Sequence, residues 1–428
     1  MRHVIARCAL LLAALLLAAV AAGCGGGDDD DGGDAGSATG TTGGGGEGEL
    51  SGSVTVWAMG AEGEKLSVLA DDFMAENPGT TVNVTPIAWD VAHDKLLTSV
   101  AGNTTPDISQ MGTTWMGEFA STGALAEVPD DIDLDTTYEG ARNTAIVDGT
   151  AYGVPWYVET RVLYYRTDIA EKAGITEPPT TWDELKEMAV AMKEQGGARY
   201  GISLSPNNWQ ELLPFVWQNG GEAASEDGFS FDSPEVVEAL EFYKSFFEEG
   251  LTSPSVPEGF DVTQGFVAGT HPMFFSGPWH MSLIEEQGGA ELEGKWDVAL
   301  MPEKETRTSF VGGSDLVVFE DSGNKDLAWA FVRYTLEPTV QQKWYTEVSA
   351  LPSVESAWDE GELSTDENLA LFGEQLGDAK SPPPIPKWEQ IAAEVINTEM
   401  EKVMSGGVSA EQGAQSMQEK AEAIGTGA

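Results

Sequence analysis

GVPWYVETRVLYYRTD, residues 153–168, is the stretch that decides the fold. Its bulky residues alternate with a period of two, which predicts a strand. One face carries Tyr157, Glu159, Arg161, Leu163 and Tyr165, and the other carries Trp156, Val158, Thr160, Val162 and Tyr164. The apolar content predicts burial, yet a glutamate and an arginine lie two residues apart on one face. An opposite-charge pair in a buried strand needs an explanation from the rest of the chain.

Strand-like and helix-like segments alternate on the N-terminal side of this stretch. The period-two runs 53–59, 81–89 and 106–111 predict strands. The segments between these strands, residues 62–77 and 90–101, have apolar residues at helical spacing. This β-α-β-α-β order predicts a parallel or mixed sheet covered by helices.

The C-terminal side predicts a second set of elements. Helix 180–197 has Thr181 as its N-cap with Glu184 as a capping-box partner, and helix 233–250 begins with Ser233-Pro234. Further strands are expected at 271–279, 296–302 and 315–321, and further helices at 325–337, 338–347 and 386–405. We therefore expect one α/β assembly of two lobes with several crossings between them.

The N-terminus predicts a lipoprotein signal peptide over residues 1–23. Two arginines precede an apolar run (9–22) that is too short for a mature membrane helix. The run ends in AAGC (21–24), which resembles a bacterial lipobox with alanine in place of the usual leucine. We expect lipidation at Cys24, the alternative being a plain secretory cleavage site. Residues 24–52, rich in Gly and Asp, predict a disordered tether.

The chain is strongly acidic, with 22 Lys+Arg against 71 Asp+Glu and a net charge of -49. Such a field repels phosphate backbones, which argues against nucleic acid as a partner. The acidity indicates either a solvated surface that keeps the protein monomeric or a salt-rich habitat in which charge repulsion is screened.

Enzyme and metal motifs are sparse in the sequence. There is no GxSxG, HExxH, CxxC or P-loop, and the chain has 4 histidines. A catalytic triad or a histidine-rich metal site is thus poorly supplied, and neither a cofactor nor a metal is expected. Abundant carboxylates leave a paired-carboxylate glycosidase open.

Tryptophan is the conspicuous residue type, with 13 in the chain. Five lie beside predicted caps or turns: Trp115, Trp156, Trp209, Trp279 and Trp388. Indole faces stack on sugar rings while carboxylates, amides and Arg bind the hydroxyls, so these residues suit a sugar pocket as well as a core. Trp182, Trp217, Trp296, Trp329 and Trp344 lie within element patterns and are expected in the core.

Three segments together resemble family 1 extracellular solute-binding proteins, the sugar-binding components of ABC importers. They are residues 153–189, residues 269–286 with a strand leading into Gly-Pro-Trp, and residues 309–353. With Trp57, the segment 106–127 and the C-terminal helices, the likeness covers nearly all of 53–428.

The resemblance implies the two-lobed periplasmic-binding-protein fold of type II, in which lobes joined by crossover strands close over one ligand. The lobes would be 53–157 plus 311–350 and 158–310 plus 351–428. The implied function is capture of a mono- or oligosaccharide without a chemical step. The implied partners are the ligand and the transmembrane subunits of a permease. The lipidated Cys24 would anchor a monomer to the outer face of the cell membrane.

The resemblance also assigns ligand contacts. Glu159 falls on the crossover-strand acid, Arg161 lies beside it, and Trp279 is the stacking aromatic of Gly-Pro-Trp. The other expected contacts lie on loops and strands around these three: Tyr157, Trp388, Asn208, Trp209, Thr114, Trp115, Glu62 and Gly313.

Two positions depart from the maltodextrin-binding members of the family. Thr114-Trp115 stand where those members carry Asp-Arg, and Ala61-Glu62 where they carry Asp-Lys. These changes count against maltodextrin specificity but leave the sugar class intact. Two alternatives also stay open: another solute on the same fold, such as a polyamine, an iron or a phosphate compound, and a surface carbohydrate-active enzyme.

Overall fold

A computed structural model describes residues 50–225, 227–256 and 259–427. The predicted signal peptide, Cys24 and the predicted tether up to residue 49 lie outside the described residues. Every helix in the described part is too short or too polar to cross a bilayer.

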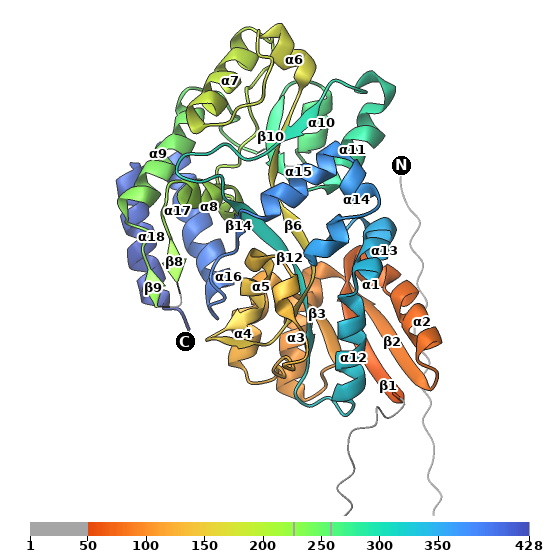
Figure 1. The fold of residues 1–428 in the computed structure, drawn as a ribbon. Helices are drawn as coiled ribbons and strands as arrows, with labels where there is room; N and C mark the ends of the chain where they lie inside the picture. The colour runs from red at the N-terminus through yellow and green to blue at the C-terminus, as the bar shows by residue number, and fades with distance from the viewer. Residues whose placement is uncertain (1–49, 226, 257–258, 428) are drawn as a thin grey trace, which may run out of the picture. The chain divides into compact units, whose positions relative to one another are not determined.

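The larger sheet has seven strands and mixed direction. Its order is β13-β6-β12-β3-β1-β2, with β14 paired to β12. The strands are β1 (Gly52–Met59), β2 (Thr80–Ile87), β3 (Ile108–Gly112), β6 (Val154–Thr160), β12 (Ser309–Val318), β13 (Leu351–Pro352) and β14 (Ala379–Lys380). β1 is parallel to β2 and β3, whereas β12 is antiparallel to β3 and β6. The β-α-β-α-β order predicted for the N-terminal segment is confirmed (Figure 1).

Helices and short strands surround this sheet. They are α1 (Gly60–Lys65), α2 (Ser67–Glu76), α3 (Trp89–Gly102), α4 (Met116–Ser121), α5 (Glu139–Ala145), α12 (Lys325–Thr335), α13 (Pro338–Val348), β4 (Ile146–Val147) and β5 (Thr150–Ala151). The helix predicted at 62–77 is present as α1 and α2, which meet at the buried Leu66. Trp156 of β6 is 0% exposed and stacks on Trp344 of α13, with ring centroids 5.0 Å apart. Of the two roles that the sequence left open for Trp156, sugar pocket or core, the structure therefore shows the core.

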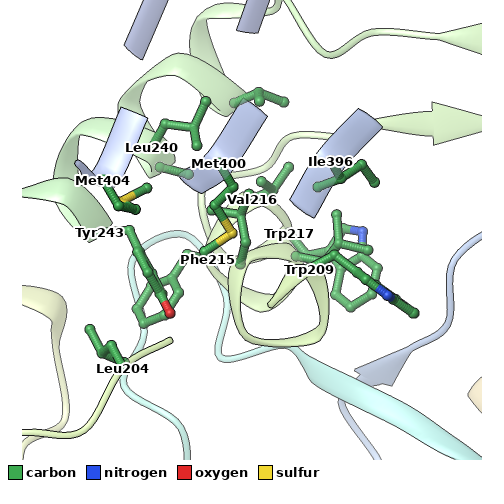
Figure 2. Close-up of a cluster of buried hydrophobic side chains, with 14 of the residues drawn as sticks. Leu204, Trp209, Phe215, Val216, Trp217, Leu240, Tyr243, Ile396, Met400 and Met404 are labelled. Carbon is green, nitrogen blue, oxygen red and sulfur yellow. The ribbon is translucent and has the colours of Figure 1, made fainter. Parts of the chain in front are cut away.

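The smaller sheet has three antiparallel strands in the order β10-β7-β11. These are β7 (Val162–Tyr165), β10 (Met273–Ser276) and β11 (Asp297–Ala299). Around it and toward the C-terminus lie α6 (Thr167–Lys172), α7 (Trp182–Glu194), α8 (Trp209–Gln218), β8 (Ala224–Ser225), β9 (Gly228–Phe229), α9 (Pro234–Glu248), α10 (Val262–Val267), α11 (Trp279–Gly288), α14 (Glu362–Thr365), α15 (Glu367–Leu376), α16 (Trp388–Gln390), a π-helical turn (Ile391–Ile396), α17 (Asn397–Met404) and α18 (Ala410–Ile424). Figure 2 shows the apolar cluster that joins α8, α9 and α17.

Two helix starts test the predicted caps. The Ser233 side chain accepts from the Val236 N–H, and Pro234 opens α9, as predicted. Thr181 accepts from the Glu184 N–H at 3.3 Å, so the predicted N-cap of α7 is confirmed. The Glu184 carboxylate, however, accepts from the N–H and hydroxyl of Thr180. The predicted capping box is therefore shifted by one residue.

The stretch 153–168 is two strands instead of one. β6 pairs with β12 up to Thr160, whereas β7 starts at Val162 and pairs with β10 and β11. Arg161 is the residue at which the chain leaves one sheet for the other. The charge pair therefore lies at the junction of two sheets, and the two-lobed α/β prediction is confirmed. The residue boundaries assigned to the lobes stay a prediction.

Candidate functional site

Three side chains follow the carboxyl ends of parallel strands. β1 ends at Met59, β2 at Ile87 and β3 at Gly112, and Glu62, Trp89 and Trp115 come two or three residues later. Parallel strands end at a common edge, which is where ligands bind in open α/β sheets. The Trp89 ring lies edge-to-face against Trp115 with centroids 5.7 Å apart.

Trp89 and Glu62 are close neighbours. A methyl group placed on Gly60 would lie 2.8 Å from the Trp89 ring and 3.4 Å from Oε2 of Glu62. Trp89 is 39% exposed, which is unusual for so large an apolar side chain. It was missed from the sequence because the predicted strand extended to residue 89, whereas Trp89 is the first residue of α3.

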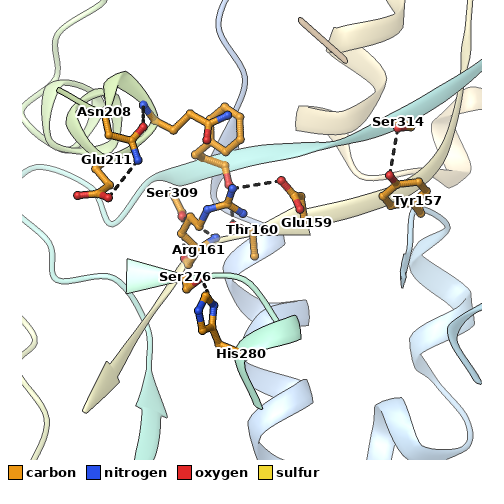
Figure 3. A network of polar contacts seen from close by, with 12 residues as sticks. Tyr157, Glu159, Thr160, Arg161, Asn208, Glu211, Ser276, His280, Ser309 and Ser314 are labelled. Carbon is orange, nitrogen blue, oxygen red and sulfur yellow. Dashed lines mark hydrogen bonds and ion pairs between the residues drawn. The ribbon is translucent and has the colours of Figure 1, made fainter. Parts of the chain in front are cut away.

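A hydrogen-bonded chain joins the end of β1 to Tyr157, which lies near Glu62. Gln110 accepts from the Met59 N–H at 2.6 Å and donates to the Tyr157 hydroxyl at 3.3 Å. Ser314 also donates to the Tyr157 hydroxyl, at 3.2 Å (Figure 3). The Tyr157 hydroxyl and the Glu62 carboxylate lie close enough for each to influence the pKa of the other. Burial raises the pKa of Glu62, and burial together with Glu62 raises the pKa of Tyr157 well above its usual range.

The Glu159–Arg161 pair occupies the junction of the sheets. Nη2 of Arg161 lies 3.1 Å from Oε1 of Glu159 (Figure 3). The guanidinium carbon lies 4.8 Å from the centre of the Trp279 ring and 5.5 Å from that of Phe310. Nη1 is buried and has no hydrogen-bond partner within the residues that the structure describes. A buried donor without a partner is costly, so this position suits an acceptor on a ligand.

Trp279 is the first residue of α11 and is 37% exposed. A methyl group on Gly277 would lie 1.9 Å from the indole, so the ring folds back over the glycine of the Gly-Pro-Trp motif. His280, the next residue, is 2.6 Å from the Ser276 hydroxyl. Burial lowers the pKa of His280 to about 4, which keeps this histidine neutral at pH 7.

Two predicted contact residues form the apolar layer behind this site. Trp388 is 1% exposed and Trp209 is 9% exposed. Their rings pack edge-to-face with centroids 5.4 Å apart, and Trp209 packs in the same way on Phe310 at 5.6 Å. Figure 2 places Trp209 in the apolar cluster of α8. Trp209 thus supports Phe310 directly and Trp388 supports Trp209, while Phe310 in turn underlies Arg161.

Three other predicted residues have structural roles. Asn208 caps α8 by accepting from the Gln210 N–H at 3.1 Å, and it donates to Glu211 at 3.0 Å. Gly313 has φ of +119°, and a methyl group there would lie 2.2 Å from the Tyr157 carbonyl oxygen. Packing against β6 is therefore sufficient to require glycine at this position. Thr114 is half-buried in the short turn Thr113–Trp115.

The structure thus brings Glu62, Tyr157, Glu159, Arg161 and Trp279 into one strip along β6, with Trp115 joined to it through Trp89. A cavity of about 440 Å³ lies elsewhere, beside α5 and β14, and is lined by Tyr138, Glu139, Gly140, Asn143, Glu355 and residues 376–381. None of the predicted ligand contacts is among its lining residues. Among the described residues, no cluster of three or more His, Cys, Asp or Glu is arranged to hold a metal ion.

Two sheets joined at Arg161, with a polar strip and the exposed Trp279 at the junction, agree with the arrangement expected of a solute-binding protein. The sequence pattern described as bacterial extracellular solute-binding protein matches residues 58–342. The chain therefore belongs to this family, whose members are extracytoplasmic binding proteins of ABC importers.

Individual relatives agree with this assignment. A binding protein of Brucella abortus is 32% identical over 347 residues, which cover 78% of this chain and 83% of the relative. The diacetylchitobiose binding protein DasA of Streptomyces coelicolor is 28% identical over 376 residues, covering 84% of this chain and 87% of the relative. The solved structure of the sugar-binding protein MalE from Xanthomonas citri matches with a TM-score of 0.83 at 32% identity, covering 87% of this chain and 97% of that chain.

Proposed function

We propose that this protein captures a saccharide at the strip along β6 and delivers it to the membrane subunits of an ABC importer. The observation that carries the proposal is the combination of exposed Trp279 with the Glu159–Arg161 pair at the junction of the sheets. An aromatic face beside charged hydrogen-bonding groups is the chemistry that sugars require. The sugar ligands in the names of two relatives support the same class.

Capture involves closure of the lobes and no bond-making. The chain changes sheets at Arg161, and beside it β12 changes its partner from β14 to β6, so this crossing is the natural place for bending. A sugar that touches both lobes makes more contacts when they are closed and thereby shifts the population to the closed form. In the bound state, Glu159 accepts from ring hydroxyls, and Arg161 donates through the nitrogen that lacks a partner.

The lipid anchor belongs to the same proposal. Cleavage after residue 23 and lipidation of Cys24 tie the protein to the outer face of the cell membrane. The tether predicted from the composition of residues 24–52 would then let the folded part, as a monomer, reach its permease.

A thermal-shift panel tests the proposal. We expect one or more mono- or oligosaccharides to raise the melting temperature, because a ligand that binds only the folded state stabilises it. Polyamines, iron chelates and phosphate serve as parallel arms. Three carboxylates, Glu62, Glu159 and Glu211, lie at or near the strip and give the cationic ligands a chemical basis. Stabilisation by one of these and by no sugar would contradict the proposal.

The same samples decide between binding and catalysis. The sugar that stabilises the protein is incubated with it and analysed for products by chromatography. We expect the sugar to be recovered unchanged, and release of shorter saccharides would replace the binding function with a glycosidase.

A further inference from the structure

We infer that His93 is a positioning residue for the ligand site, because it fixes the ring of Trp115 as one wall of that site. This inference rests on the proposed saccharide-binding function and adds to it a residue that no sequence motif marks. His93 lies on α3 one helical turn after Trp89, so the two side chains share a face of the helix. Both of them contact Trp115.

The indole of Trp115 is restricted from three sides. Trp115 follows the carboxyl end of β3, at the edge where ligands bind in open α/β sheets. The Trp89 ring lies edge-to-face against it with centroids 5.7 Å apart, and the His93 ring does so at 5.1 Å. A methyl group on Gly112 would lie 3.2 Å from the indole, so the ring also folds back against the last residue of β3. These contacts hold the indole in one orientation before a ligand arrives.

The imidazole of His93 is itself held by α4. Nε2 of His93 lies 2.8 Å from Oε2 of Glu118, and because an ionised carboxylate only accepts, Nε2 carries the proton of this bond. The imidazole also packs edge-to-face on Phe119, with centroids 5.7 Å apart. Glu118 and Phe119 both lie on α4, which begins directly after Trp115. His93 therefore ties α3, which carries the exposed Trp89, to the segment that carries Trp115.

These contacts affect binding more than stability. The side chains of His93 and Glu118 are 29% and 33% exposed, and an ion pair at such a position contributes little to the stability of a fold. A mobile indole, by contrast, loses rotamer freedom when a ligand packs on it, which lowers affinity by about two- to tenfold. With His93 in place, the Trp115 ring is already ordered and this loss does not occur on binding.

Calorimetric titration of a double-mutant cycle tests this inference, with the best saccharide of the thermal-shift panel as the ligand. The cycle comprises wild type, His93→Ala, Trp115→Ala and the double variant. We expect His93→Ala to weaken binding by about two- to tenfold and Trp115→Ala by about tenfold or more. In the double variant the loss of His93 should weaken binding no further, because the ring that it positions is gone.

Three further variants separate positioning from folding. Glu118→Gln keeps an oxygen that accepts from Nε2 and is expected to bind like wild type, whereas Glu118→Ala should weaken binding. Glu118→Ala also replaces His93→Ala in the cycle if that variant does not fold. Asp94→Asn is the matched control and should bind like wild type, because Asp94 lies 3.8 Å from the other ring nitrogen of His93 but its side chain is 94% exposed.

The outcomes separate the inference from the function on which it rests. If His93→Ala binds like wild type, or weakens binding equally with and without the Trp115 indole, His93 does not act through Trp115 and the inference is wrong. Wild-type affinity in Trp115→Ala would also overturn it, while the protein remains a sugar binder in each of these cases. If no saccharide binds wild type, the proposed function itself fails.

Discussion

Arg161 is the residue that connects the two halves of the site. Its N–H donates to the Ser309 hydroxyl at 3.3 Å, and its carbonyl accepts from the same hydroxyl at 2.7 Å. These bonds join the two crossing segments where both change partners. Taken by itself, the ion pair with Glu159 is compatible both with a structural role at the hinge and with ligand binding. The buried nitrogen without a partner, among the residues described, favours the ligand contact.

Asp315 is a second residue with a testable consequence. It is 0% exposed on β12, its side chain accepts from the Thr144 hydroxyl at 3.1 Å, and burial raises its pKa from 3.8 to about 7. Between pH 3.8 and about pH 7, Asp315 therefore keeps a proton in the folded protein that it has released in the unfolded chain. The free energy of unfolding therefore falls as the pH rises from about 4 to about 7, by on the order of 4 kcal/mol.

Asp315→Asn is expected to lose this part of the pH dependence, because the amide stays neutral in both states. Urea denaturation of wild type and variant at pH 5 and pH 8 measures the effect. Asp131→Asn, which removes an exposed partner of Arg333, is the control and should keep the wild-type slope. An unchanged slope in Asp315→Asn would show that another group causes the pH dependence.

At the scale of elements, the pairing of β12 with β6 depends on glycine. Gly313 combines a positive φ with a 2.2 Å approach to the Tyr157 carbonyl. We expect Gly313→Ala to lower the free energy of unfolding by about 2 kcal/mol or more, because the added methyl group forces the two strands apart. Gly323→Ala is the control, since nothing lies within 4 Å of its added methyl group. Equal melting temperatures for the two variants would contradict this account of the crossing strands.

Local patterns predicted most elements correctly. The period of two in 53–59 and the Ser233-Pro234 start of α9 are signals that depend on neighbouring residues alone. The break at Arg161 left no such signal, because the alternation continues through it while the partner strands change. The sequence also did not show which residue Glu184 binds. Thr180, next to the predicted partner Thr181, donates both its N–H and its hydroxyl to the Glu184 carboxylate.

The candidate site was predictable only in part. Glu159, Arg161 and Trp279 were assigned through the family resemblance, which rests on a strand with a charge pair and on a Gly-Pro-Trp motif that are visible in the sequence. At the start of a helix, the periodicity of the sequence does not indicate whether a tryptophan side chain is exposed or buried. For this reason Trp209 and Trp388 were expected at the ligand although they lie in the core, and exposed Trp89 was overlooked.

At the scale of the whole molecule, charge and fold constrain the ligand together. The net charge of -49 repels anionic ligands over a distance of about 10 Å at 0.1 M salt. A neutral saccharide is indifferent to this field and needs only the local acceptors, donors and indoles of the strip. The two lobes supply opposite ends of that strip, so affinity depends on their closing together.

The most direct test of the central claim is calorimetric titration of the best saccharide into wild type and Trp279→Ala. Trp296→Ala, which removes a half-buried indole stacked on Tyr164, is the control. We expect Trp279→Ala to weaken binding by about tenfold or more, the value of one stacked ring, while the control binds like wild type. Unchanged affinity in Trp279→Ala would show that the sugar binds away from the junction of the two sheets.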